Sequence, residues 1–291
     1  MLFIMEKLGN SLLILAMALI FQSHSVITKI FTPQQVVATI EDNRLIEASG
    51  LEESIKNPGY FWTHNDSDSE PILYLIDGKG SIKMEVELAG IENRDWEEIV
   101  TVKDGNESFI FIGEIGDNKA VHEYVSLIRI EEPALSEVNR ITIPFNRLEI
   151  MNFQYAEGAR DAEAVLYDYN LEEFVLVTKR EENAMVYSFP FIPGRSQTFI
   201  TSKGTLPARL FTAADMNEEG EILLKHYGAI YYWGSSNQSA MERILAWNPI
   251  QIDYIPEPQG EAICWFNRDF YTISEKNTGK PQEMLFFERL K

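Results

Sequence analysis

A short motif recurs five times along the chain at nearly regular intervals. It combines acidic or polar residues with small ones and leads into an apolar segment. The copies are EASGL at Glu47, DWEEI at Asp95, DAEAV at Asp161, TAADM at Thr212 and QGEAI at Gln259, and they start 48, 66, 51 and 47 residues apart. Repeats of about 40 to 50 residues built from four short strands are typical of β-propeller blades.

The sequence that follows each motif repeats as well. Each copy continues into two segments rich in β-branched and aromatic residues, which are typical of strands separated by polar turns. The first segments are 60–66, 109–117, 174–180, 221–226 and 270–276, and the second begin at Ile72, Val125, Ala184, Ala229 and Glu283. Long helical periodicity is absent after the N-terminal stretch, which disfavours helices layered on sheets.

These patterns predict an all-β chain that forms a five-bladed β-propeller. A six-bladed ring is the alternative, because the 66-residue interval holds extra sequence at 136–155. That sequence would form an extended outer hairpin or a concealed sixth blade.

The two ends of the chain complement each other. The last repeat, 259–291, has 33 residues and lacks a fourth strand, whereas the 21 residues 26–46 precede the first motif. We therefore predict that 34–42 (QQVVATIED) supplies the outer strand of the last blade and closes the ring. Closure removes the sheet edges that would otherwise promote aggregation.

The N-terminus has the pattern of a secretory signal peptide. Lys7 precedes ten apolar residues, 12–21, and Ser23 and Ser25 lie at positions −3 and −1 of a cleavage site. The run is too short for a membrane span, which needs roughly 20 residues. We expect a signal peptide at 1–25, a single β-propeller domain at 26–291, a secreted or periplasmic location and no membrane span after cleavage.

Composition and missing motifs exclude several classes of function. With 25 Lys and Arg against 45 Asp and Glu, the net charge is −20, which opposes binding to nucleic acid. A lone cysteine, Cys264, excludes an intramolecular disulfide. The chain has no P-loop and no G-x-S-x-G motif, the common signatures of nucleotide and serine hydrolases. We expect no organic cofactor.

Three further segments carry a resemblance to a known group. They are THND at 63–66, GEIGDN at 113–118, and DAEA at 161–164 with TKR at 178–180. With the TAAD and QGEA copies of the motif, they make the chain similar to secreted bacterial β-propellers of the phytase-like and SdiA-regulated kind. The resemblance implies a propeller and, from its phytase-like branch, calcium held by carboxylates in and above the central channel.

In a propeller, equivalent positions of the inner strands face one another across the channel. Aligning the motifs gives one column of Glu47, Asp95, Asp161, Thr212 and Gln259, and a second of Ser49, Glu97, Glu163, Ala214 and Glu261. The candidate metal ligands are Glu47, Asp95, Glu97, Asp161, Glu163, Asp215 and Glu261. Like charges at such density bind a cation, pair with bases or stay partly protonated.

Other polar residues end the strands at the same level: His64, Asn65, Asp66, Glu114, Asp117, Lys179 and Arg180. Three interpretations stay open. The carboxylates form a salt-bridge network that fixes blade register, or they hold a divalent cation, with Ca²⁺ as the candidate. In the third, they form a catalytic site in which Glu97, Asp161 or Glu163 is the general base and His64, Lys179 or Arg180 stabilises developing charge.

The function that follows is a binding or interaction role at the acidic channel. We expect a monomer whose partner is a small molecule or an extracellular protein or glycan. The alternatives are a calcium-dependent hydrolase of phytase-like or lactonase-like type, and a structural scaffold without metal. A hydrolase needs an open coordination position beside a base, whereas a scaffold predicts that every carboxylate is paired.

Overall fold

The computed structural model describes residues 29–67, 69–194 and 198–291, and Phe31–Lys291 forms one compact unit. The predicted signal peptide, 1–25, lies outside the described residues. Among the helices of the described part, none has the length and apolar character that crossing a membrane requires.

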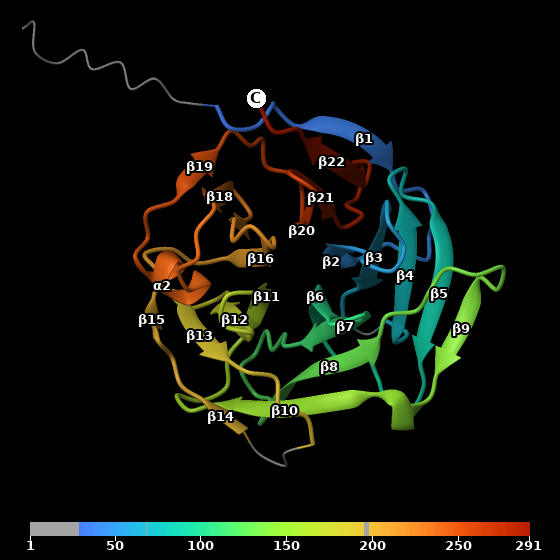
Figure 1. Ribbon diagram of the computed structural model, residues 1–291, viewed down its shortest axis with the longest axis horizontal. Coiled ribbons are helices and arrows are strands. Elements are labelled where there is room, and N and C mark those ends of the chain that lie inside the picture. Colours follow the sequence, from blue (N-terminus) through green and yellow to red (C-terminus); the bar gives the residue numbers. More distant parts are fainter. Residues whose placement is uncertain (1–28, 68, 195–197) are drawn as a thin grey trace, which may run out of the picture. The chain divides into compact units, whose positions relative to one another are not determined.

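Five sheets surround a common axis as the blades of a propeller (Figure 1). Blade 1 contains β2 (Ala48–Glu53), β3 (Tyr60–Asn65), β4 (Ile72–Asp77), β5 (Ile82–Leu88) and β9 (Arg140–Ile143). Blade 2 contains β6 (Trp96–Asp104), β7 (Glu107–Glu114), β8 (Val125–Glu131), β10 (Glu149–Tyr155) and β14 (Thr198–Ile200). Blade 3 contains β11 (Ala162–Asp168), β12 (Glu173–Thr178), β13 (Met185–Phe189) and β15 (Gly204–Thr205).

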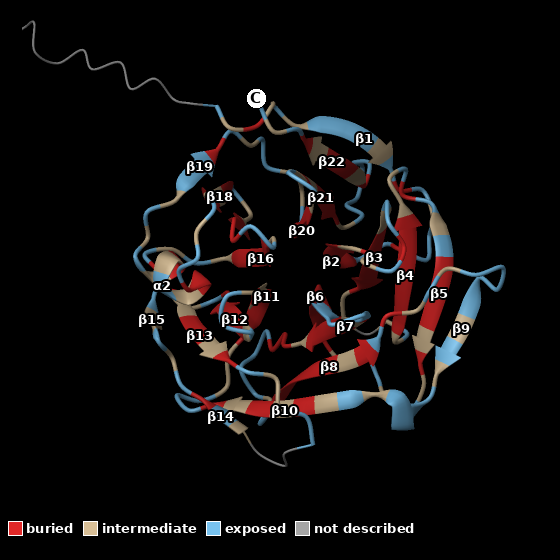
Figure 2. Cartoon of the chain, in the orientation of Figure 1, coloured by how far each residue is buried: buried red, intermediate tan, exposed pale blue. Residues whose placement is uncertain are grey.

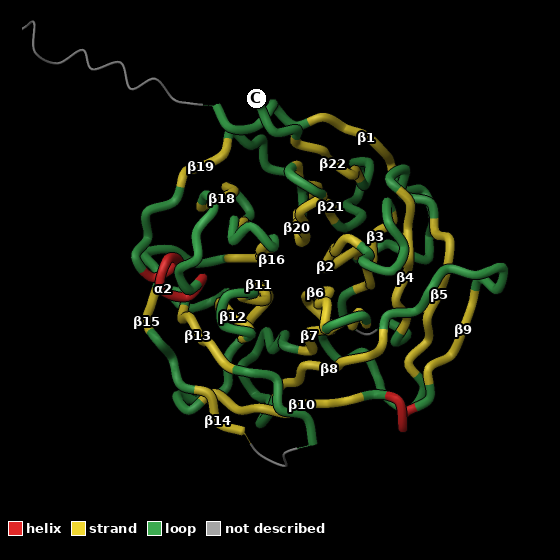
Figure 3. Tube along the Cα trace, viewed as in Figure 1, coloured by secondary structure: helices red, strands yellow, loops and turns green. Residues whose placement is uncertain are grey.

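Blade 4 contains β16 (Phe211–Met216), β17 (Ile222–His226), β18 (Ala229–Trp233) and β19 (Ile250–Ile252). Blade 5 contains β20 (Gly260–Phe266), β21 (Asp269–Ser274), β22 (Glu283–Phe287) and β1 (Gln35–Thr39). Helix within the described residues is limited to α2 (Ala240–Leu245) and the 3₁₀ turn η1 (Phe145–Arg147), as Figure 3 shows. The prediction of an all-β, five-bladed propeller is confirmed.

Each repeated motif leads into the innermost strand of its blade. These strands are β2, β6, β11, β16 and β20, and each contacts the next around the ring. Figure 2 shows that they are buried along most of their length. The equivalent ends of the inner strands therefore meet at the same mouth of the central channel.

The ring closes through the two ends of the chain, as predicted. β1 pairs antiparallel with β22, with Gln35 opposite Phe286 and Thr39 opposite Glu283. Phe31 adds a bridge to Arg289, and its ring lies 4.9 Å from that of Phe270. Blade 5 is thus assembled from both termini of the propeller.

The extra sequence at 136–155 forms neither the predicted outer hairpin nor a sixth blade, so both predictions are wrong. Its first strand, β9, pairs parallel with β5 at the edge of blade 1. Its second strand, β10, pairs with β8 in blade 2. Two short strands are too few for a blade of their own, and adding one to each of two existing edges covers both edges.

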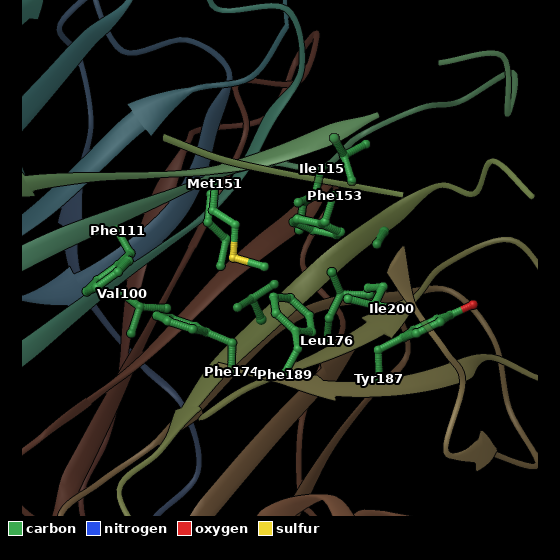
Figure 4. Close-up of a cluster of buried hydrophobic side chains, with 14 of the residues drawn as sticks. Val100, Phe111, Ile115, Met151, Phe153, Phe174, Leu176, Tyr187, Phe189 and Ile200 are labelled. Atoms are coloured by element: carbon green, nitrogen blue, oxygen red, sulfur yellow. The ribbon is translucent and has the colours of Figure 1, made fainter. Parts of the chain in front are cut away.

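Hydrophobic side chains fill the space between neighbouring blades. Figure 4 shows the cluster between blades 2 and 3, where Phe111 and Phe153 meet Phe174 and Phe189. A buried carboxylate adds a polar link between blades 1 and 2. Glu132, after β8, accepts hydrogen bonds from Ser54 Oγ at 2.5 Å, Lys56 N at 3.0 Å and Trp62 Nε1 at 2.9 Å.

Candidate metal centre

The inner strands of blades 2 to 5 begin with a β-bulge. The ladder skips one residue in each: Glu97, Glu163, Thr212 and Glu261. A bulge inserts an extra residue and re-aims its side chain. In blade 1 the skipped residue is Gly50. Thr212, rather than Ala214, therefore shares the position of Glu163 and Glu261, and Gly50, rather than Ser49, shares it in blade 1. Our motif alignment is wrong by two residues in blade 4 and by one residue in blade 1.

Five carboxylates from three blades converge at this mouth, and we call them the carboxylate cluster. They form two groups that share Glu97: Asp66, Asp95 and Glu97, and Glu97, Asp161 and Glu163. Within each group, one oxygen of every residue lies within 4.8 Å of the others. All except Asp66 are buried.

Two bases balance the charge on the blade 3 side of the cluster. Lys179 forms an ion pair with Glu163 and lies 3.9 Å from Glu261 Oε2. Arg180 Nε lies 2.5 Å from Asp161 Oδ2. In the described part of the chain, no ion pair reaches Asp66, Asp95 or Glu97. The pairing of every carboxylate, which the scaffold interpretation requires, is not met.

Burial and mutual repulsion raise the pKa values of the unpaired carboxyls. Burial raises the pKa of Asp95 to about 7, and the charges of Asp66 and Asp161 add to the effect. The pKa of Glu97 is raised for the same reasons, burial first and then Asp66 and Asp95. Three oxygens of the cluster, Asp95 Oδ1, Asp161 Oδ2 and Glu163 Oε2, are buried without a hydrogen-bond partner, and the second of them forms an ion pair with Arg180. The cluster therefore has unused acceptors and excess negative charge whenever its members ionise.

The loop after β7 forms one wall of the cluster. A Cβ at Gly116 would overlap both Asp95 Cγ and Glu97 Oε1, so only glycine lets the backbone approach these carboxylates. The next residue, Asp117, donates its backbone N–H to Asp161 Oδ1 at 2.8 Å. Our sequence reasoning missed Gly116, although the GEIGDN segment that contains it was identified.

The carboxylate of Asp117 stabilises this loop by hydrogen bonds to backbone groups of the loop itself. It accepts hydrogen bonds from the backbone N–H groups of Val121 at 2.9 Å and His122 at 2.8 Å. Glu114, at the end of β7, lies 3.3 Å from Arg94 Nε. Both of these predicted residues thus position the loop rather than join the cluster.

Two predicted residues near the end of β3, His64 and Asn65, lie outside the cluster and have structural roles. His64 is fully buried, and burial lowers its pKa to about 4, so it is neutral near pH 7 and supplies no positive charge. Asn65 accepts from Glu47 N at 3.1 Å and donates to Arg44 O at 2.7 Å. The side chain of Glu47 is exposed.

Glu261 and Asp215 lie outside the cluster in different ways. Glu261 borders it through Lys179 and accepts a hydrogen bond from the Tyr227 hydroxyl at 2.5 Å. Asp215 lies near the opposite ends of the inner strands, where Trp265 N donates to its Oδ2 at 2.6 Å. Two other buried carboxyls, Glu52 and Glu98, accompany Asp215, and our sequence reasoning missed both.

Comparison with known proteins gives similarity of fold alone. No protein-family model and no curated protein matches the chain. A solved structure of a luciferin-regenerating enzyme is 9% identical, with a TM-score of 0.45, and the match covers 87% of this chain and 95% of that one. The Malassezia sympodialis allergen Mala s 1 is 10% identical with a TM-score of 0.49, covering 89% and 96%. A putative oxidoreductase (glucose dehydrogenase) from Thermus thermophilus is 8% identical with a TM-score of 0.47, covering 88% and 99%.

Proposed function

We propose that the carboxylate cluster binds a divalent cation, Ca²⁺ in the first instance, and that this site gives the propeller a binding role at one mouth of its channel. The observation that carries the proposal is the group formed by Asp66, Asp95 and Glu97. Their oxygens converge, none of the three forms an ion pair among the described residues, and Asp95 Oδ1 is buried and unpartnered.

The donor set fits a hard cation. Every ligand atom in the cluster is a carboxylate oxygen, and Ca²⁺ takes six to eight oxygen ligands. Zinc and copper favour imidazole or thiolate, but His64 and Cys264 are not members of the cluster. A bound cation would also offset the repulsion that raises the pKa values of Asp95 and Glu97.

The predicted signal peptide and the resemblance to phytase-like and SdiA-regulated propellers support a secreted or periplasmic protein of this kind. A cation at the mouth, with the partly exposed Arg180 guanidinium beside it, would attract an anionic small ligand or an acidic group on an extracellular partner.

Hydrolysis of a phosphate ester or lactone is the second candidate. It is supported by the raised pKa of Glu97, because a carboxylate whose pKa is raised by burial is a stronger base than a free one. Arg180 would hold the developing negative charge. A bound cation supplies Lewis-acid polarisation of the substrate oxygen in such sites.

Thermal unfolding tests the proposal directly. Residues 26–291 are melted in EDTA and then in rising CaCl₂, because a ligand that binds only the folded state adds about 2.7 kcal/mol of stability at 100 times its Kd. We expect a calcium-dependent rise in Tm that Glu97→Gln abolishes. Glu107→Gln, which alters an exposed residue of the β6–β7 hairpin, is the matched control and should keep the full rise. Equal melting of the wild-type protein with EDTA, Ca²⁺ and Mg²⁺ would overturn the proposal.

A further inference from the structure

A cavity of about 240 Å³ lies between blades 2 and 3, at the end of the blades away from the carboxylate cluster. Late residues of β6 and β11 and early residues of β7 and β12 line it, whereas the cluster lies at the first residues of β6 and β11. The five residues from Glu97 to Val102 span about 17 Å of extended chain, so the two sites are separate.

Five aromatic residues line this cavity as one connected set. Phe111 and Phe174, both labelled in Figure 4, are the most deeply buried of them, with ring centroids 4.8 Å apart. Phe109, Tyr167 and Phe191 are only partly buried, so parts of their rings are accessible from the cavity. The ring of Tyr167 lies 5.2 Å from that of Phe174, and the ring of Phe191 lies 5.0 Å from that of Phe111. The cavity therefore offers accessible aromatic surface to a ligand.

Two of these rings already hold a cation of the protein itself. The guanidinium carbon of Arg129 lies 4.8 Å from the ring centroid of Phe109 and 5.2 Å from that of Phe191. Glu149 forms an ion pair with this guanidinium and offsets its charge. Aromatic faces attract cations, most strongly where water is excluded. Among the described residues no cation lies over the ring of Tyr167, so its accessible surface is open to one.

The charge around the cavity also favours a cation. Asp104 and Glu172 line it as exposed carboxylates, and neither forms an ion pair within the described ranges. Burial raises the pKa of Tyr167, and the charges of Glu172 and Asp104 add to the effect, so both carboxylates lie near its hydroxyl. Lys103 is left to oppose them, because Arg129 already has a carboxylate partner. The balance is negative, as it is for the whole chain at −20.

Glu172 has a backbone conformation that favours glycine. Its φ is +56°, in the left-handed region where most side chains are strained. Strained residues of this kind are concentrated at ligand-binding sites. Replacing Glu172 with glycine would remove the carboxylate from the cavity and relieve the strain, so this change tests the charge without endangering the fold.

We propose that this cavity binds a small quaternary ammonium cation. Its methyl groups would contact the rings of Tyr167 and Phe109. Asp104 and Glu172 would offset its charge. A quaternary ammonium has no N–H group to satisfy, which suits a lining of ring faces, whereas a primary ammonium needs hydrogen-bond acceptors in place of its water.

The size of the cavity agrees with such a ligand. A cavity of about 150 Å³ holds a benzene-sized molecule, so this one has room for a trimethylammonium group on a short chain. The inference goes beyond the proposed function, because it concerns the other end of the blades and needs no metal.

Isothermal titration in EDTA with three small molecules tests the proposal. Choline carries the trimethylammonium group, 3,3-dimethylbutan-1-ol has the same shape without the charge, and ethanolamine keeps a charged nitrogen without the methyl groups. We expect heat of binding with choline and about tenfold weaker binding of the other two. Tyr167→Leu and Glu172→Gly should each weaken choline binding about fivefold, through the loss of one ring or one carboxylate.

Glu137→Gln is the matched control. It removes an exposed carboxylate from the loop before β9, in blade 1, and should leave choline affinity unchanged. Glu172→Gly keeps the test valid if Tyr167→Leu fails to fold. Equal binding of choline and its neutral analogue, no heat with choline at about 20 mM, or unchanged affinity in both cavity variants would overturn the proposal.

Sedimentation with phosphatidylcholine vesicles distinguishes two sources of the same chemical group. Cosedimentation that excess choline prevents would assign a lipid head group, whereas choline binding without cosedimentation would assign a free cation. Because the titrations are run in EDTA, they do not depend on the carboxylate cluster. A failed calcium titration with intact choline binding would contradict only the proposed function.

Discussion

Replacing Asp215 with asparagine should flatten the dependence of stability on pH. The carboxyl is fully buried, and burial raises its pKa from 3.8 to about 7. The charged and titratable groups that face it are Glu52, Glu53, Glu98, Tyr169 and Cys264. No base is among them, and the backbone N–H groups of Trp265 and Met216, which favour the ionised form, only partly offset the effect of burial.

The sign follows from the raised pKa. Between about pH 4 and pH 7 the folded state keeps a proton on Asp215 that the unfolded state has lost, so stability is greatest at low pH and falls as pH rises towards 7. Each pH unit in that window costs about 1.36 kcal/mol, so the group removes about 3 kcal/mol between pH 5 and pH 8. An asparagine at this position would keep an acceptor for Trp265 N and has no proton to lose.

This effect is measured by urea unfolding in EDTA at pH 5 and at pH 8, with tryptophan fluorescence as the signal. We expect Asp215→Asn to be about 1.6 kcal/mol more stable than the wild-type protein at pH 5 and about 4.4 kcal/mol more stable at pH 8, so that the difference grows by about 3 kcal/mol. The other buried carboxyls titrate in both proteins, so comparison of the two isolates Asp215 and its direct neighbours. The same stability difference at both pH values would refute the reasoning.

Four further predictions concern other parts of the molecule. Glu132→Ala should lower the free energy of unfolding by about 3 to 5 kcal/mol in urea, because it leaves three donors in blade 1 without their acceptor; a loss below about 1 kcal/mol would contradict the role of this link. Gly116→Ala should abolish the calcium-dependent rise in Tm, because the added Cβ would displace the carboxylates of Asp95 and Glu97. An unchanged rise would contradict the role of Gly116, because it would show that the loop can move away without disturbing the site. Deletion of residues 26–46 should lower the Tm of the whole protein in one cooperative transition seen by circular dichroism, because it removes β1 from blade 5; melting like the intact protein would count against ring closure. In EDTA, stability should fall from pH 5 to pH 8 because burial raises the pKa values of Asp95 and Glu97, and saturating Ca²⁺ should cancel much of that fall; an equal fall with and without Ca²⁺ would argue against a cation in the cluster.

The sequence predicted the blades and their closure because both depend on local patterns. Strand periodicity and the motif that opens each inner strand recur in every repeat, and the two incomplete ends add up to one repeat. The path of 136–155 was not predictable in this way. β9 pairs with β5, which lies more than fifty residues earlier in the sequence. A local sequence pattern does not predict which open sheet edge a strand will join.

The candidate site was predicted in part. Asp95, Glu97, Asp161 and Glu163 come from the motifs, and the structure brings them together with Asp66. Blade 4 was misaligned by two residues, because its bulge falls on the first residue of the motif, Thr212, and not on the third as in blades 2, 3 and 5. Pairing with the next strand sets the position of a bulge, and the composition of a short motif does not state it. Glu52 and Glu98 were missed because their proximity to Asp215 depends on how blades 1, 2 and 4 face one another across the channel. Whether a cation binds stays a prediction.

The pairing of β1 with β22 has a consequence for how the protein is made. On the ribosome, β1 is synthesised first among the strands of the propeller and its partner β22 last. Until then, Val36 and Val37 belong to an edge that has no neighbour, and blade 5 exists only as a fragment. Contacts between residues so far apart in sequence form slowly because a long loop must close before they are gained. Final assembly therefore waits until β22 has been made, and until then the nascent β1 needs protection from other unpaired strands.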